Sequence, residues 1–163
     1  MIVVGTGHRP NRLRNEWSYV GPFSDKIRLT IRATFTELEN VEMVISGMAL
    51  GYDQILAQEA LNLRIPVLAA IPCQDQDKLW QAESKRIYNE ILGNSLVTQK
   101  LVSRGPYEYS KMFSRDLWML HQIQIGDVLL ACFDGEPYGG TYKTYKYAQK
   151  LEKTIINIWD KLL

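Results

Sequence analysis

The sequence lacks the features that would place it in a membrane or among disulfide-bonded secreted proteins. Its two cysteines, Cys73 and Cys132, lie in apolar stretches and form no CxxC pair, which predicts buried free thiols in a reducing compartment. No apolar run approaches the ~20 residues that a membrane span needs. Met1 leads directly into an apolar segment, without the basic region of a signal peptide. We therefore expect a cytoplasmic protein with no membrane partner.

An excess of charge of one sign is also missing. The 19 Lys and Arg residues nearly balance the 18 Asp and Glu residues, and the formal net charge is +1. This balance argues against a protein that holds nucleic acid through a general basic field, so nucleic acid is not an expected partner. The chain has 163 residues, of which 46% are hydrophobic, and no repeat, low-complexity tract or linker divides it. We expect one domain over residues 1–163.

Short apolar runs alternate with longer amphipathic stretches along the chain. Runs typical of buried strands cover residues 2–4, 41–45, 66–71, 127–133 and 154–158, and segment 95–102 fits a further strand or an extended edge. Helical spacing covers residues 23–38, 52–63, 78–92, 110–125 and 141–151. The alternation predicts an α/β fold, a single Rossmann-like doubly wound and mainly parallel sheet with helices on both faces. Such sheets bind ligands beyond the carboxyl ends of their strands.

The first loop at such a strand end reads GTGHRP. Gly5 and Gly7 let backbone N–H groups approach an anion closely, and the Thr6 hydroxyl adds a donor. Arg9 can bind a phosphate or carboxylate through two parallel hydrogen bonds. His8 joins the candidate ligand-binding residues, although a lone histidine more often has a structural role. The third glycine of the GxGxxG fingerprint is missing, so a tight turn with solvated basic residues is the alternative.

The second loop reads SGMALGYD and links a strand to a helix. We expect its N–H groups, around Ser46, Gly47 and Gly51, to face the ligand, with the helix dipole favouring an anion. Asp53 falls near the first turn of the helix. It either caps that helix or forms a hydrogen bond with a ribose hydroxyl or a base.

The third loop places Gly139, Gly140 and Thr141 at the start of a helix. This arrangement predicts a third anion cradle, and its alternative is a glycine-rich loop in which Thr141 caps the helix. Three glycine-rich loops at three strand-to-helix junctions favour a single phosphate-bearing ligand that touches all of them.

Two further side chains are candidates for the ligand site. Arg115 is flanked by apolar residues at helical spacing and so needs an anionic partner, either an internal aspartate or the ligand. Trp80 is predicted to begin a helix, where it stacks on a base or packs in the core. No HExxH, P-loop or GxSxG motif is present, so we expect no metal ion and no cofactor.

The segments GTGHRP, SGMALGYD, IPCQDQDKLW, MFSRDLWM and FDGEPYGGTYKTYKYA, in this order, resemble the SLOG superfamily of SMF/DprA and "Lonely guy" (LOG) proteins, and most of all its YpsA-like group. The resemblance implies a nucleotide-binding domain that is often dimeric, so a homodimer or higher homo-oligomer is expected. The ligand-site residues that it implies are Gly5, Thr6, Gly47, Gly51, Asp53, Arg115, Gly140 and Thr141.

The sequence departs from the phosphoribohydrolases of that superfamily. Their PGGxGTxxE signature carries a catalytic glutamate, where this chain has Lys143 and Thr144. Asp53 or Glu136 would have to supply the missing carboxylate, because cleavage of an N-glycosidic bond needs one. The sequence thus favours binding or sensing of a nucleotide or nucleotide derivative, such as an ADP-ribose-like molecule. A nucleotide N-glycosidase is the alternative, and a DNA-processing role is disfavoured by the near-neutral charge.

Overall fold

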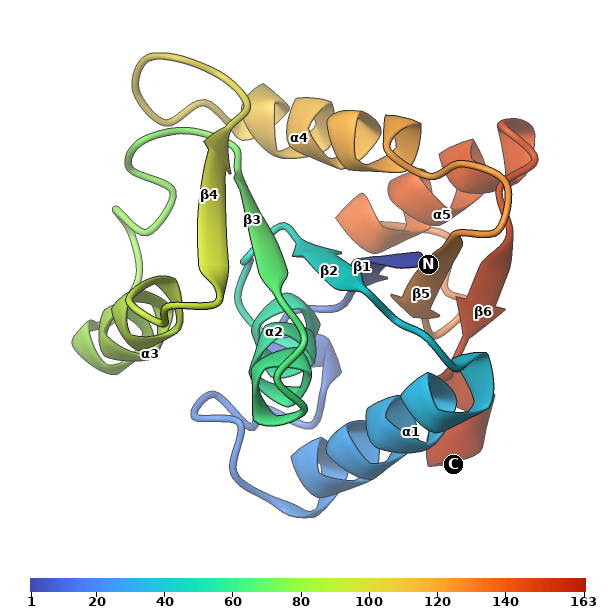
Figure 1. Ribbon diagram of the computed structural model, residues 1–163. Helices are drawn as coiled ribbons and strands as arrows, with labels where there is room; N and C mark the ends of the chain where they lie inside the picture. The colour runs from blue at the N-terminus through green and yellow to red at the C-terminus, as the bar shows by residue number, and fades with distance from the viewer.

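Six parallel strands form one sheet in the computed structural model, which describes residues 1–163 (Figure 1). The strands are β1 (Ile2–Gly7), β2 (Met43–Ser46), β3 (Val67–Ile71), β4 (Val97–Leu101), β5 (Val128–Cys132) and β6 (Ile155–Asn157). Their order is β4-β3-β2-β1-β5-β6, and every neighbouring pair is parallel. The predicted fold class is confirmed.

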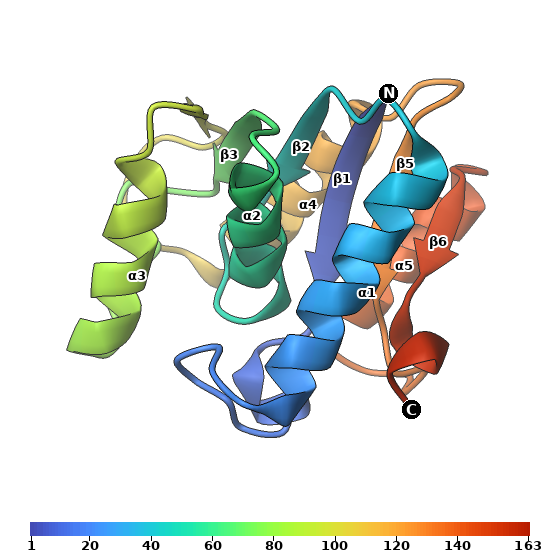
Figure 2. The same ribbon diagram turned by 60° about the horizontal axis from the view of Figure 1, so that its bottom comes forward.

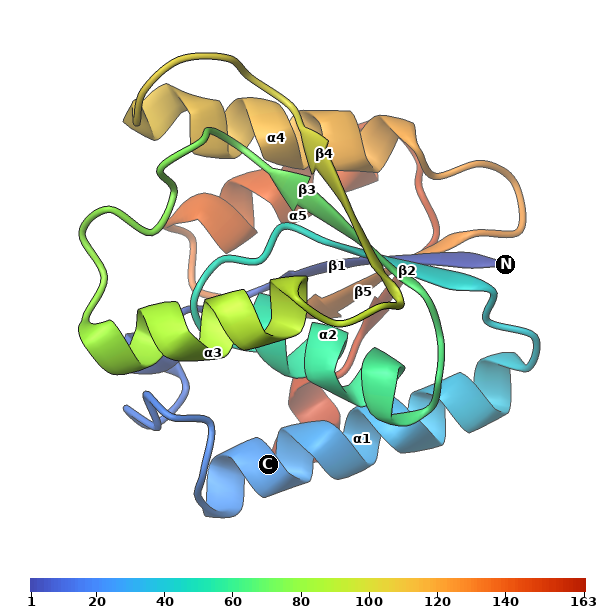
Figure 3. The ribbon, with the colours of Figure 1, turned by 60° about the vertical axis from the view of Figure 1, so that its left-hand side comes forward.

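Five helices cover the two faces of the sheet. On one face lie α1 (Pro22–Leu38), α2 (Tyr52–Asn62) and α3 (Ala82–Leu92), and on the other α4 (Tyr109–His121) and α5 (Gly140–Lys150) (Figures 2 and 3). A cluster of 25 buried hydrophobic residues fills the first interface and one of 8 fills the second. Short 3-10 helices at Pro10–Arg12 and Trp159–Leu162 complete the chain. None of the helices combines the length and apolar character that a membrane crossing requires.

Two helices and one strand differ in extent from the sequence prediction. Helix α3 begins at Ala82, because residues 75–80 form successive turns that imitate helical spacing, so Trp80 lies in the loop before the helix. Helix α4 ends at His121, where the Asp127 carboxylate accepts the Gln124 N–H (3.1 Å) and turns the chain toward β5. The ambiguous segment 95–102 contains β4, a mostly exposed edge strand.

Helix α2 packs unusually close to β1 and the loop that follows it. A Cβ atom at Gly7 would clash with the Tyr52 ring, and one at Gly5 would clash with Leu56. Gly51 has a φ of +94°, and a Cβ atom there would meet the backbone of His8 and Arg9. The Tyr52 N–H donates to the His8 carbonyl at 3.1 Å. These glycines are therefore required by helix packing.

Replacing Gly51 with alanine tests this packing. We expect Gly51→Ala to lower the free energy of unfolding by more than about 3 kcal/mol, since it adds a clash with backbone to an unfavourable φ. Gly126→Ala is the matched control, because Gly126 has the same φ of +94° with no atom within 4 Å of the added Cβ. That control should lose only about 1–2 kcal/mol in urea denaturation. Equal losses would show that α2 can move away from the loop.

Candidate functional site

A cavity of about 360 Å³ opens at the carboxyl edge of the sheet, between the loops that follow β1 and β5. The strand order reverses here, because β1 has β2 on one side and β5 on the other. Ligands of doubly wound sheets bind at such switch points. The sequence-predicted residues that line the cavity are Thr6, Gly7, His8, Arg9, Asp53, Arg115, Gly139, Gly140 and Thr141.

The other predicted residues lie elsewhere. Gly5, Ser46, Gly47 and Gly51 are buried and do not line the cavity; the three glycines allow close packing, and the Ser46 hydroxyl forms hydrogen bonds within its own loop. Glu136 is exposed in the β5–α5 turn and outside the cavity lining, so it is poorly placed to supply a catalytic carboxylate. Trp80 lines a neighbouring cavity. Lining residues that sequence reasoning missed are Asn11, Arg12, Ala49, Tyr109, Met112, Asp116 and Tyr138.

The N-terminus of α5 presents unused hydrogen-bond donors to the cavity. Gly139, with a φ of +93°, is the N-cap, and no side chain caps the helix. Thr141 is thus inside the helix and is not its cap. The first intrahelical donor is the Lys143 N–H, which leaves the N–H groups of residues 140–142 without protein partners. No atom lies within 4 Å of a Cβ built on Gly140. This helix end is suited to an anion.

The N-terminus of α2 is different, because backbone N–H groups of the loop before it donate hydrogen bonds within the fold. Four backbone N–H groups find acceptors within the fold: Met48 donates to Ser46 Oγ, Ala49 to Asp53 Oδ2, Gly51 to Tyr19 Oη and Tyr52 to the His8 carbonyl. For these four groups, the expectation that the loop offers free N–H groups to a ligand is wrong. The loop contributes Ala49 and the Asp53 side chain to the cavity lining.

Arg115 is buried, with 3% of its surface exposed, and its anionic partner is internal. Nε donates to Asp116 Oδ1 at 2.7 Å, and Nη1 donates to the carbonyls of Gly47 and Ala70. A Cβ atom on Gly47 would clash with the guanidinium, which explains that glycine. Nη2 makes no hydrogen bond within the protein, so Arg115 keeps one group for the cavity that it lines.

Asp116 brings a carboxylate from α4 to α5. Its Oδ2 accepts the Thr144 hydroxyl at 3.2 Å, and Thr144 is one of the two residues at the expected glutamate position. The α5 helix thus lacks its own acidic group but contacts one on the neighbouring helix. Only the adjacency of Arg115 and Asp116 in the sequence hinted at this partner.

Asp53 carries the most unusual ionisable group of the cavity. Burial raises the pKa of its carboxyl to about 7; Asp116 adds to the increase, while Arg115, the Ala49 N–H and Arg9 oppose it. Only 7% of its surface is exposed. A carboxyl group with this pKa exchanges a proton at neutral pH and can donate or accept a hydrogen bond.

His8 has a structural role. Burial lowers the pKa of its imidazole to about 4, so the ring is neutral at physiological pH. Nε2 lies 3.1 Å from the Asp134 backbone nitrogen, and the ring packs against Phe133 and Trp159. His8 thereby joins the loop after β1 to the end of β5.

The three cavity arginines differ in how their charge is balanced. Arg12 forms two hydrogen bonds to the Asp134 carboxylate, donates to the Tyr138 carbonyl at 3.0 Å and stacks on the Tyr138 ring. Arg115 is paired with Asp116. Arg9 is exposed and forms no ion pair, so it is the one of the three cavity arginines without a paired carboxylate.

The fold and this edge of the sheet define a class of protein, the doubly wound Rossmann-like α/β domains. The structure resembles DNA processing protein A (DprA) from Streptococcus pneumoniae, with a TM-score of 0.63 and 16% identity, over 94% of this chain and 48% of that one. The chain therefore spans about half the length of DprA, and the likeness is one of fold.

Sequence comparison identifies a nearer group. Over 141 residues the chain is 30% identical to the "Uncharacterized SPbeta prophage-derived protein YoqJ" of Bacillus subtilis (strain 168), covering 77% of this chain and 80% of that protein. The chain belongs to the family of YoqJ. No protein-family model matches the sequence.

The raised pKa of Asp53 predicts a pH-dependent cost to stability. The folded state holds this proton up to about pH 7, whereas the unfolded state loses it near the ordinary value of 3.8. Stability from this group is therefore complete below pH 3.8 and is lost as the pH rises through 7. We expect Asp53→Asn to gain stability relative to the parent between pH 5 and pH 8.5, by about 2.5–3 kcal/mol. Urea denaturation of both proteins measures this difference, and a constant difference would contradict the raised pKa.

Proposed function

We propose that this chain, as a single YpsA-like domain over residues 1–163, binds or senses a nucleotide or nucleotide-derived ligand through its phosphate. The observation that carries the proposal is the unfilled N-terminus of α5, in a cavity that Arg9 also lines. Three backbone N–H groups there lack partners, no side chain covers Gly140, and the Arg9 charge is uncompensated. Together they supply the dipole, the donors and the charge that bind a phosphate group.

We assign Asp53 to hydrogen bonding with the ribose of the ligand. An ionised carboxylate repels a phosphate, so the phosphate belongs at the α5 end and not beside Asp53. A carboxyl group that can both donate and accept hydrogen bonds suits ribose hydroxyls, which also do both. The unpaired Nη2 of Arg115 adds a donor to the same part of the cavity.

The proposed ligand is a small molecule and not a long nucleic acid. The structural neighbour is named a DNA processing protein, but the chain has a net charge of +1 and a cavity of about 360 Å³. Binding along a phosphate backbone draws on many basic side chains, which this balance does not favour. The cytoplasmic location and the homo-oligomeric state remain predictions.

One observation favours a second candidate, a nucleotide N-glycosidase. Asp53 has a pKa of about 7, as a general acid or base requires, and Asp116 lines the same cavity. However, both Asp116 oxygens are already engaged, by Arg115 and Thr144. Only Asp53 is left as an active carboxyl, and binding without cleavage is the function that the geometry supports best.

Gly140→Ala tests the phosphate site with little disturbance to the fold. The added methyl meets no protein atom but occupies the position where the phosphate would contact the helix. We expect it to weaken the binding of a nucleoside monophosphate or ADP-ribose by roughly 10-fold or more, the scale of one charge-assisted hydrogen bond, with no loss of thermal stability. Isothermal titration calorimetry measures the affinity, and an unchanged affinity would refute the phosphate position.

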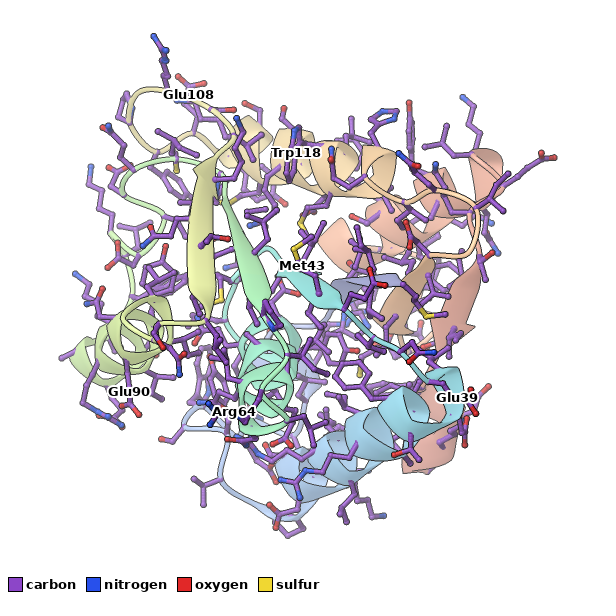
Figure 4. All side chains as sticks on the ribbon, viewed as in Figure 1. Glu39, Met43, Arg64, Glu90, Glu108 and Trp118 are labelled. Carbon is purple, nitrogen blue, oxygen red and sulfur yellow. The ribbon has the colours of Figure 1, made fainter.

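Arg9→Gln should weaken the same ligands to a similar extent. Its matched control is Arg64→Gln, which removes the same charge from the exposed segment after the far end of α2 (Figure 4). If both variants weaken binding equally, the effect is one of overall charge, and Arg9 has no special place.

We expect no release of free base when the protein is incubated with a panel of nucleoside monophosphates. Departure of the base leaves positive charge on the sugar, and Lys143 on α5 does not stabilise it. Chromatography of the reaction products measures the free base. Turnover near the usual ~1–10³ s⁻¹, abolished by Asp53→Asn, would establish the second candidate instead.

A further inference from the structure

A second cavity, of about 270 Å³, adjoins the first. Arg9 and Met112 line both of them. Four loops far apart in the sequence build its walls: the loops between β1 and α1, between β2 and α2, between β3 and α3, and between β4 and α4. Its apolar and aromatic lining consists of Trp17, Leu50, Leu79, Trp80 and Tyr107.

The aromatic wall has one fixed and one accessible tryptophan. Trp80 is partly buried, and its ring contacts the Tyr88 ring edge to face at a centroid distance of 5.1 Å. Trp17 is 47% exposed, although a surface tryptophan normally buries most of its ring. Planar aromatic groups of this kind offer a stacking surface to a nucleobase.

The polar groups of the second cavity are few, and one has no partner. Ser84, in the first turn of α3, is only 6% exposed, yet its hydroxyl makes no hydrogen bond within the protein. Gln76 is buried; its amide donates to the Tyr88 hydroxyl at 3.3 Å, and its oxygen lies 3.5 Å from Arg115 Nη1. An apolar cavity with a small number of placed polar groups is typical of ligand sites.

We propose that the second cavity receives the nucleobase of the same ligand whose phosphate lies at the α5 N-terminus, an inference that rests on the proposed function. Each cavity alone is near the lower end of the roughly 300–1,000 Å³ range of ligand sites, and their junction at Arg9 and Met112 makes one longer site. The ligand is then a nucleotide with an intact aromatic base, stacked against Trp80 and Trp17, with Ser84 available to its polar edge.

The test separates the base from the rest of the ligand. Affinities for adenosine monophosphate, guanosine monophosphate and cytidine monophosphate are compared with that for ribose 5-phosphate, by calorimetry on the intact chain. We expect at least one nucleotide to bind roughly 10-fold or more tightly than ribose 5-phosphate, the scale of one base stacked on an aromatic ring. Trp17→Ala and Trp80→Leu should reduce this advantage, whereas Trp80→Phe keeps most of it. Ribose 5-phosphate should bind all variants equally.

Trp118→Leu is the control, because Trp118 lies on α4 and packs against the smaller core cluster, away from the second cavity (Figure 4).

Ribose 5-phosphate binding without any advantage of a base would overturn this inference and leave the proposed function standing. No binding of either ligand would refute both. If Trp80→Leu does not fold, Trp17→Ala and Ser84→Ala take its place, since neither removes a core contact of the Trp80 ring. If a nucleotide binds both of these variants more tightly than ribose 5-phosphate by the same factor as it does the parent, the inference is overturned.

Discussion

The close contact between α2 and β1 is the constraint on which the rest of the site depends. Glycine at positions 5, 7 and 51 allows the helix to lie directly against the strand and its loop. The contact commits the N-terminal donors of α2 to the fold, through bonds such as that from the Tyr52 N–H to the His8 carbonyl. It also buries Asp53, whose pKa rises as a result. Because α2 engages its donors in this way, α5 is, of these two helices, the one whose N-terminal donors remain open to a ligand.

The strands and helices could be predicted from the sequence because burial on both faces of a parallel sheet leaves a strong pattern. The glycines were also found, but not the reason for them. A glycine that lets a ligand approach and one that lets a helix approach have the same sequence signal. Gly47 illustrates the problem, since the group that needs its missing side chain is the Arg115 guanidinium. Gly140 is the contrasting case, with open space above it.

The features that sequence reasoning missed all depend on contacts between distant segments. Asp116 acquires its place in the cavity only because α4 lies beside α5 and reaches Thr144. The second cavity exists only where four loops meet, and no one of them carries a motif for it. Trp80 was identified as a candidate but assigned to a helix, because the turns before α3 repeat helical spacing. Such juxtapositions are properties of the folded chain and leave no local pattern.

Binding of the proposed ligand in the cavity is linked to the protonation of the buried Asp53 carboxyl. An anionic ligand that approaches this group raises its proton affinity further, so the complex takes up hydrogen ions as it forms. The pKa of this carboxyl is about 7. A modest change in pH therefore alters the fraction of molecules in which the carboxyl is protonated and does not repel a negatively charged ligand. With the ligand that we propose, an aspartate that would be charged in water therefore couples pH to binding.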